Sequence, residues 1–126
     1  FDHAIALNNF ASFLQDRAAR DDKPELRLRA IELLRESLAV REALDGPNST
    51  RVANAAGNLG TALCGAGTPA DAVPFLDRSF RIRDVTLGRL HPETVKALFN
   101  LTLVTRYAHG PATVPELAAD LETRLV

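Results

Sequence analysis

Residues 68–92, TPADAVPFLDRSFRIRDVTLGRLHP, decide the fold of this chain. When the sequence is shifted by 42 positions, an upstream segment falls on this stretch with matching small, apolar and basic sites. The matched pairs include Ala30 with Ala72, Leu34 with Leu76, Ser37 with Ser79, Leu38 with Phe80, Arg41 with Arg83, Gly46 with Gly88, Asn58 with Asn100 and Leu59 with Leu101. A fixed period with matching apolar positions is the signature of a repeat array, in which small units stack around one continuous core.

Composition excludes several classes of protein. The chain has 126 residues, 46% of them hydrophobic and 25% charged, which is typical of one globular domain rather than a disordered segment. The net charge of −1 argues against nucleic-acid binding, and no apolar run is long enough to span a membrane. The lone Cys64 cannot form an internal disulfide, which fits a cytoplasmic protein. Because the chain begins with Phe1 and contains no Met, we expect a fragment of a longer protein.

Apolar periodicity predicts six helices and no strand. The expected ranges are 1–19, 24–45, a third helix that Asn48 or Ser49 caps and that runs to about 64, a fourth from 68 to Gly88, a fifth over 92–108, and a sixth after Pro115. Thr68 is expected to cap the fourth helix through its hydroxyl, and Thr113 with Glu116 has the pattern of a capping box. Pro74 is expected to bend the fourth helix locally, and His91 to cap the fifth.

One apolar face of each helix is expected to point inward. The expected residues are Leu7, Phe10, Ala11 and Leu14; Ala30, Ile31, Leu34, Leu38 and Ala39; Ala56, Leu59, Gly60 and Leu63; Ala72, Leu76, Ser79 and Phe80; Leu98, Leu101 and Thr102; and Leu117, Leu121 and Leu125. Glycine inside a helix costs about 1 kcal/mol relative to alanine. Gly57 and Gly60 are therefore expected to mark a close approach of two helices.

The repeat resembles the tetratricopeptide repeat, whose pattern reads large-x2-Leu-Gly-x2-large, then Gly, then Ala-x3-large. The matching residues are Ala56, Leu59, Gly60, Leu63, Gly67, Ala72 and Leu76. The period of 42 and the phrases AIALNNFASFL, ANAAGNLGTAL and LGRLHPETV are similar to the repeats of the kinesin light chain. The resemblance implies an all-α, right-handed superhelix of three antiparallel helix pairs. We expect one array over residues 1–126, with repeats at about 1–46, 47–88 and 89–126.

The first repeat carries an insertion. Asn58 lies 14 positions before Ala72, whereas Asn9 lies 21 before Ala30. Seven residues are about two helical turns, which two antiparallel helices can share without losing their register. We expect a longer first hairpin with Arg20–Lys23 at its tip, although a simple loop insertion is the alternative.

A second stripe on the first helix of each pair is expected to face the inner curve of the superhelix. This stripe contains Ile5, Asn9, Ser12 and Asp16; Asn54, Asn58 and Thr61; and Lys96, Asn100, Leu103 and Arg106 or Tyr107. An amide can donate and accept, so it can pair with the backbone of an extended peptide, and the resemblance implies such contacts for asparagine at this site. The candidate peptide- or partner-binding residues are Asn9, Asn54, Asn58, Lys96, Asn100 and Arg106, with Asn8 and Phe99 as weaker candidates. Alternatively, the asparagines bridge neighbouring helices.

The remaining polar residues indicate no chemistry. His3, His91 and His109 lack metal-ligand spacing, Cys64 has the context of a small packing residue, and no catalytic motif occurs, so we expect neither an enzyme nor a metal or cofactor. The basic residues Arg78, Arg81, Arg83 and Arg89 are expected on a solvated outer face. Two functions follow: a protein-interaction module that binds a peptide or partner domain in its concave groove, or a regulatory or oligomerisation segment of a larger bacterial signalling protein, with self-association through exposed array ends.

Overall fold

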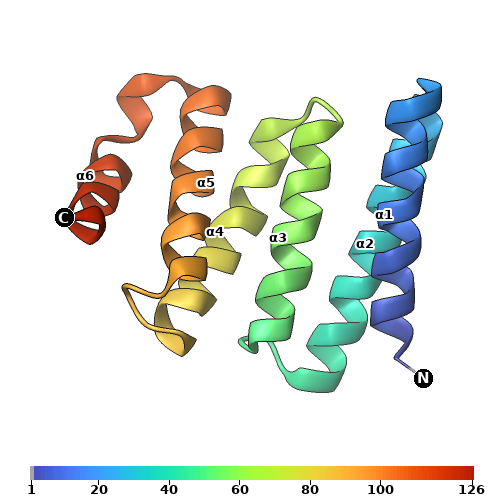
Figure 1. Cartoon of the computed structure of the whole chain (residues 1–126), viewed down its shortest axis with the longest axis horizontal. Coiled ribbons are helices and arrows are strands. Elements are labelled where there is room, and N and C mark those ends of the chain that lie inside the picture. Colours follow the sequence, from blue (N-terminus) through green and yellow to red (C-terminus); the bar gives the residue numbers. More distant parts are fainter. Residues whose placement is uncertain (1) are drawn as a thin grey trace.

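The computed structural model describes residues 2–126, and within this range the chain is all-helical, without a strand (Figure 1). The α-helices are α1 (His3–Asp21), α2 (Pro24–Asp45), α3 (Thr50–Gly65), α4 (Pro69–Thr86), α5 (Pro92–His109) and α6 (Pro115–Leu125), and a short 3-10 helix, η1 (Pro111–Thr113), precedes α6. The predicted helices are therefore confirmed. Phe1, where the first helix was expected to begin, lies outside the described residues.

The helices form antiparallel pairs that stack in sequence order. Figure 1 shows α1 beside α2, α3 beside α4 and α5 beside α6, with the two ends of the chain at opposite ends of the stack. Each helix packs chiefly on its neighbours in the sequence, and the second helix of one pair also contacts the first helix of the next. This is the arrangement of a helical superhelix, in which each repeat contacts only adjacent repeats.

A continuous apolar core runs through the stack. Leu34, Leu59, Leu98 and Leu101, one or two from each helix pair, are almost completely buried. All four belong to the predicted inward stripes. Because every pair contributes to the same cluster of buried side chains, no pair buries its apolar face alone.

Two helices approach each other closely between α3 and α4. A Cβ atom at Gly60 would lie 2.8 Å from both Cγ and Cδ2 of Leu76 and 3.4 Å from the carbonyl oxygen of Ala72. A Cβ at Gly57 would lie 3.2 Å from the hydroxyl oxygen of Ser79. The prediction that both glycines mark a close helix contact is confirmed.

The first hairpin is longer than the second, as the insertion predicted. α1 and α2 contain 19 and 22 residues, whereas α3 and α4 contain 16 and 18. The seven extra residues are therefore helical, and only Asp22 and Lys23 separate α1 from α2. Asp22 ends α1 in the left-handed conformation, with φ of 52°.

Helix capping agrees with the sequence at two positions and disagrees at two others. Ser49 accepts a hydrogen bond from the Val52 amide, and His91 accepts one from the Glu93 amide through Nδ1. Thr68 precedes α4 as expected, but its hydroxyl donates to the carbonyl of Leu63 instead of capping α4. The capping box at Thr113 is wrong: η1 occupies residues 111–113, and the Thr113 hydroxyl donates to the carbonyl of Gly110.

Three predicted inward residues are exposed. Phe10 is 51% exposed, Leu125 is 66% exposed, and Ala39 also faces solvent, whereas Leu33 is buried and was missed. Phe10 and Leu125 lie on α1 and α6, the first and last helices of the described stack. The pattern of apolar residues identifies a face that packs in the repeat, but it does not show which copy of that face lies at an end.

The apolar stripe of α6 is not its only attachment to the stack. A buried arginine, Arg124, also holds α6 against α4. The Arg124 guanidinium donates to the carboxylate of Asp84 on α4 at 2.7 Å, to that of Asp120 at 2.9 Å and to the carbonyl of Arg89. It also lies 5.0 Å from the ring centroid of Phe80. The hydrogen bond from Arg124 is the main cause that lowers the pKa of Asp120, and Asp84 and Asp120 together raise the pKa of Arg124.

Replacing Gly60 with Leu is expected to destabilise the chain. The first side-chain carbon would already overlap Leu76, and overpacking of this kind typically costs about 1–3 kcal/mol. The matched control is Ala39→Leu, which adds the same side chain to an exposed helical site. Urea denaturation would measure both variants, and a Gly60→Leu midpoint equal to that of the control would contradict the close approach.

Replacing Arg124 with Met is expected to loosen α6 while α1–α4 stay folded. Hydrogen bonds to charged groups contribute about 1.5–3 kcal/mol each, and partial exposure of Asp84 and Asp120 places the loss at the lower end. Hydrogen exchange of the α6 amides would measure this, with Arg81→Met, which removes an exposed pair with Asp77, as the control. The pKa of Asp120 is lowered in the folded chain. The pair of Asp120 with Arg124 therefore contributes fully to folding stability above the ordinary aspartate pKa of 3.8, and this contribution is lost as pH falls below that value. Unchanged α6 protection in Arg124→Met would contradict the fastening role.

Candidate functional site

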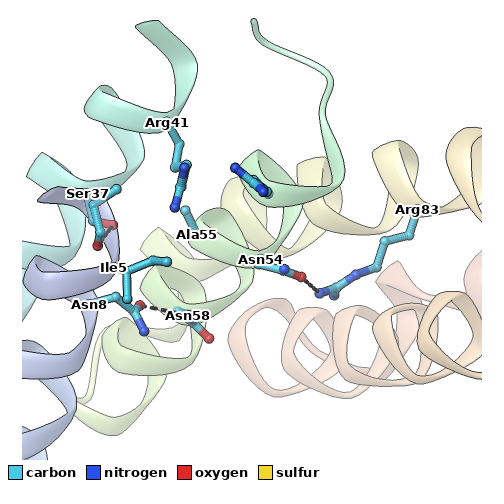
Figure 2. A pocket seen from close by; sticks show the side chains of 10 residues that line it. Ile5, Asn8, Ser37, Arg41, Asn54, Ala55, Asn58 and Arg83 are labelled. Atoms are coloured by element: carbon cyan, nitrogen blue, oxygen red, sulfur yellow. Dashed lines mark hydrogen bonds between the residues drawn. The ribbon is translucent and has the colours of Figure 1, made fainter. Parts of the chain in front are cut away.

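Two neighbouring hollows form a groove along α1, α3 and α5. The first, of about 440 Å³, is lined by Ala4, Ile5, Asn8, Ser37, Arg41, Arg51, Asn54, Ala55, Asn58 and Arg83 (Figure 2). The second, of about 250 Å³, is lined by Asn54, Gly57, Asn58, Thr61, Leu76, Ser79, Arg83, Glu93, Lys96, Ala97 and Asn100. Asn54, Asn58 and Arg83 line both hollows, so the two are adjacent, and we refer to them together as the groove.

Asparagine side chains occupy the centre of the groove. The Asn58 amide nitrogen donates to the side-chain oxygen of Asn8 at 2.9 Å, and this bond joins α3 to α1. The side-chain oxygen of Asn54 accepts from Arg83 at 2.6 Å, which joins α3 to α4 (Figure 2). Both bonds bridge helices, and each asparagine amide retains further hydrogen-bonding capacity for a ligand.

The groove brings together four of the six predicted site residues. Asn54, Asn58, Lys96 and Asn100 line the hollows. The other two, Asn9 and Arg106, are exposed and line neither hollow. In the first repeat the neighbouring Asn8 lines the groove. Asn8 corresponds to Gly57 of the second repeat, because each lies one position before the aligned asparagine, Asn9 or Asn58.

The second helices of the first two pairs, α2 and α4, contribute residues that the sequence reasoning missed. The Ser37 hydroxyl donates to the Ala4 carbonyl at 2.9 Å, and the Ser79 hydroxyl donates to the Ala53 carbonyl at 2.9 Å. Each serine therefore fastens a second helix to the first helix of its own pair. The shift of 42 matches these two serines, so the period contained the signal.

An arginine follows each serine by one helical turn. Arg41 pairs with the Asp2 carboxylate, and Arg83 donates to Asn54 and to Ser79. Arg83 therefore lines the groove, and its expected place on the solvated outer face is wrong. Arg78, also expected there, pairs with Glu42 on α2 at 2.9 Å.

The charges around the first hollow are predominantly positive. Its lining contains Arg41, Arg51 and Arg83 and no acidic residue. The Arg41 charge is balanced by two carboxylates, Asp2 and Asp45. A backbone hydrogen bond from Ile5, followed by the bond from Arg41, lowers the pKa of Asp2. In the second hollow Lys96 is accompanied by Glu93.

An apolar row continues the groove face along α5. Phe99, Leu103 and Tyr107 follow one another at intervals of one helical turn, and each is at least half exposed. The shift of 42 matches them with Gly57, Thr61 and Gly65 of α3. The groove face therefore changes from small and polar on α3 to large and apolar on α5.

Residues 2–126 offer no feature of two other classes of site. No group of three or more His, Cys, Asp or Glu residues in this range is arranged to hold a metal ion. None of the described helices combines the length and apolarity needed to cross a membrane.

Comparisons with known proteins identify the repeat. Residues 28–83 match the family model for the tetratricopeptide repeat. Two crystal structures of nearly identical TPR-like repeats from a candidate kinesin light chain of Podosopora anserina, one of them a single-substitution variant, have TM-scores of 0.76 and 0.77 and 18% identity. These alignments cover 98% of this chain and 57% of the solved chains. No curated protein matches.

A stack of antiparallel helix pairs with a polar groove along one face defines a helical-repeat scaffold. More specifically, residues 28–83 match the tetratricopeptide repeat, and the fold of the whole stack is similar to that of solved TPR-like repeats. Repeats of this kind generally mediate protein–protein interaction through extended surfaces.

Proposed function

We propose that the chain is a non-catalytic interaction module whose groove binds an extended peptide or a segment of a partner protein. The observation that carries this proposal is the adjacency of the two hollows, which share Asn54, Asn58 and Arg83. Adjacent hollows lined by amide side chains can follow the backbone of an extended chain over several residues.

The chemistry of the groove fits a peptide better than a small molecule. Asn54, Asn58 and Asn100 offer both donors and acceptors, which suit peptide groups of any sequence. Lys96 and Arg83 favour acidic side chains on the ligand. The apolar row on α5 offers adjacent contacts for large side chains of the ligand. The basic residues and this apolar row would therefore give specificity, and the amides between them would give affinity.

Replacing Asn58 with Ala is expected to weaken partner binding by about 1–3 kcal/mol, the usual cost of leaving a polar partner unpaired. Stability should change much less, because Asn58 is exposed and its hydrogen bond to Asn8 joins two accessible side chains. A partner captured from the source cell, reduced to its binding peptide, would be titrated by calorimetry.

The neighbouring Leu59→Ala provides the control. Leu59 is completely buried, so its truncation should cost about 2–5 kcal/mol of folding stability.

Lys96→Ala should weaken peptide binding more at low salt than at high salt, because the attraction between Lys96 and an acidic ligand is partly long-range. If Asn58→Ala lost as much stability as binding free energy, the asparagines would be structural bridges and the groove proposal would fail.

A second candidate function, assembly with another copy, rests on the exposed face of α1. Phe10 is 51% exposed, whereas the matching Leu59 and Leu101 are 0% and 2% exposed because the preceding helix pair covers them. Phe13 stacks against Phe10 with ring centroids 6.2 Å apart. Two copies that pack through these rings would bury the face that α3 and α5 bury inside the array.

If α1 mediates self-association, Phe13→Asp should weaken it by about tenfold or more, since a charge would be placed in an apolar contact. Sedimentation equilibrium over a range of concentrations would measure the effect. Tyr107→Asp, at the opposite end of the stack, is the matched control and should leave association unchanged. A monomer at high concentration in the unsubstituted chain would exclude this function.

A further inference from the structure

The first hollow has an excess of positive charge that the fold itself does not use. Its three arginines come from three helices: Arg41 from α2, Arg51 from α3 and Arg83 from α4. Arg41 forms ion pairs with Asp2 and Asp45. The partners of Arg83 are Ser79 and Asn54, which are neutral. Within residues 2–126 Arg51 has no hydrogen-bonding or ionic partner. Arg51 and Arg83 therefore each lack a carboxylate partner at this hollow.

The position of Arg51 is unfavourable for the helix that carries it. Arg51 lies in the first turn of α3, and this turn contains no acidic residue. A cation near a helix N-terminus opposes the helix dipole and typically costs about 0.3–1 kcal/mol. A residue that costs stability and has no partner within the chain points to a role in binding an anion.

Arg83, by contrast, is held in place for a ligand. Its Nη1 donates to the Ser79 hydroxyl at 3.0 Å and its Nη2 to the Asn54 oxygen at 2.6 Å. Ser79 is in turn bonded to the Ala53 carbonyl. A guanidinium has five N–H donors, so Arg83 retains donors for a further acceptor while its orientation is fixed. Figure 2 shows Arg41 and Arg83 on opposite sides of Asn54.

We propose that this hollow binds a phosphoryl group of the partner, as on a phosphorylated serine or threonine, through Arg51 and Arg83. The proposal rests on the groove function above and names the chemistry that one end of the groove recognises. A phosphomonoester carries a charge of about −1.5 to −2 at pH 7 and three acceptor oxygens, which match two free guanidinium charges. One carboxylate would neutralise only one of them. Asn8 and Asn58, which line the same hollow, supply amide donors for the remaining oxygens.

The test uses inorganic phosphate as the probe and needs no partner. The ¹⁵N-labelled chain would be titrated with phosphate at constant ionic strength while the arginine Nε–Hε resonances are followed by NMR. Saturable shifts confined to Arg51 and Arg83 are expected. Arg51→Gln and Arg83→Gln should each weaken phosphate binding by about tenfold or more, since each removes a charge-assisted contact.

Arg81→Gln is the matched control, because Arg81 lies on the same helix as Arg83, pairs with Asp77 and lines neither hollow of the groove. Arg51→Gln keeps the test decisive if Arg83→Gln disturbs folding, because Arg51 is exposed and unpaired in the described chain. Shifts spread over all arginines, or equal affinity in Arg51→Gln, would overturn the site.

Succinate, a dicarboxylate, is the second arm of the titration. Weaker binding of succinate than of phosphate supports phosphoryl recognition, and equal or tighter binding would overturn it in favour of an acidic peptide. Failure of this phosphate site leaves peptide binding by the groove to be decided separately by the Asn58→Ala titration. The two proposals can therefore fail independently.

Discussion

The contact between Gly60 of α3 and Leu76 of α4 is the constraint on which the rest of the stack depends. The absence of a side chain at Gly60 allows Leu76 to lie against the α3 backbone. This close contact sets how the second helix pair presents its two faces: one to the core shared with α2 and α5, the other to the groove. Asn54, Asn58 and Thr61 lie on the same helix as Gly60, so the packing contact also orients the polar side chains of the candidate site.

A serine and an arginine on α2 and on α4 also connect the two helices of a pair. Ser37 and Ser79 fasten their helices to carbonyls of α1 and α3, and the arginine one turn later reaches toward the first helix of the pair. In the first repeat the arginine meets the carboxylate of Asp2 and is neutralised. In the second it meets the amide of Asn54 and keeps its charge. Two positions differ between the repeats: when Asn9 is aligned with Asn58, Asp2 corresponds to Arg51 and Ile5 to Asn54. These differences separate a structural ion pair from a candidate binding group.

The sequence predicted the helices, their pairing and the long first hairpin because these depend on local periodicity, caps and spacing. It predicted Asn54, Asn58, Lys96 and Asn100 on one face for the same reason. It did not predict Arg51 in the groove, although Arg51 lies three residues before Asn54 on α3 and the same periodicity could have placed it there. Arg83 could not be placed in this way, because whether a side chain of α4 reaches that face depends on the crossing of two helices. Phe10 was assigned to the core because its pattern matches that of Leu59, and the pattern does not reveal which repeat is terminal. Arg124 was missed because a buried arginine is indistinguishable in sequence from an exposed one until Asp84 lies beside it.

Interaction through the groove is the central claim, and the side-chain amides of the asparagines report on it directly. With a captured partner peptide, the NH₂ resonances of Asn8, Asn54, Asn58 and Asn100 are expected to shift in a saturable manner. Asn48 lies in a separate hollow formed with Asp77, Arg78 and Val85, so its resonance serves as the internal reference and should stay unchanged. Shifts at Asn48 without shifts at the four groove asparagines would contradict binding through the groove.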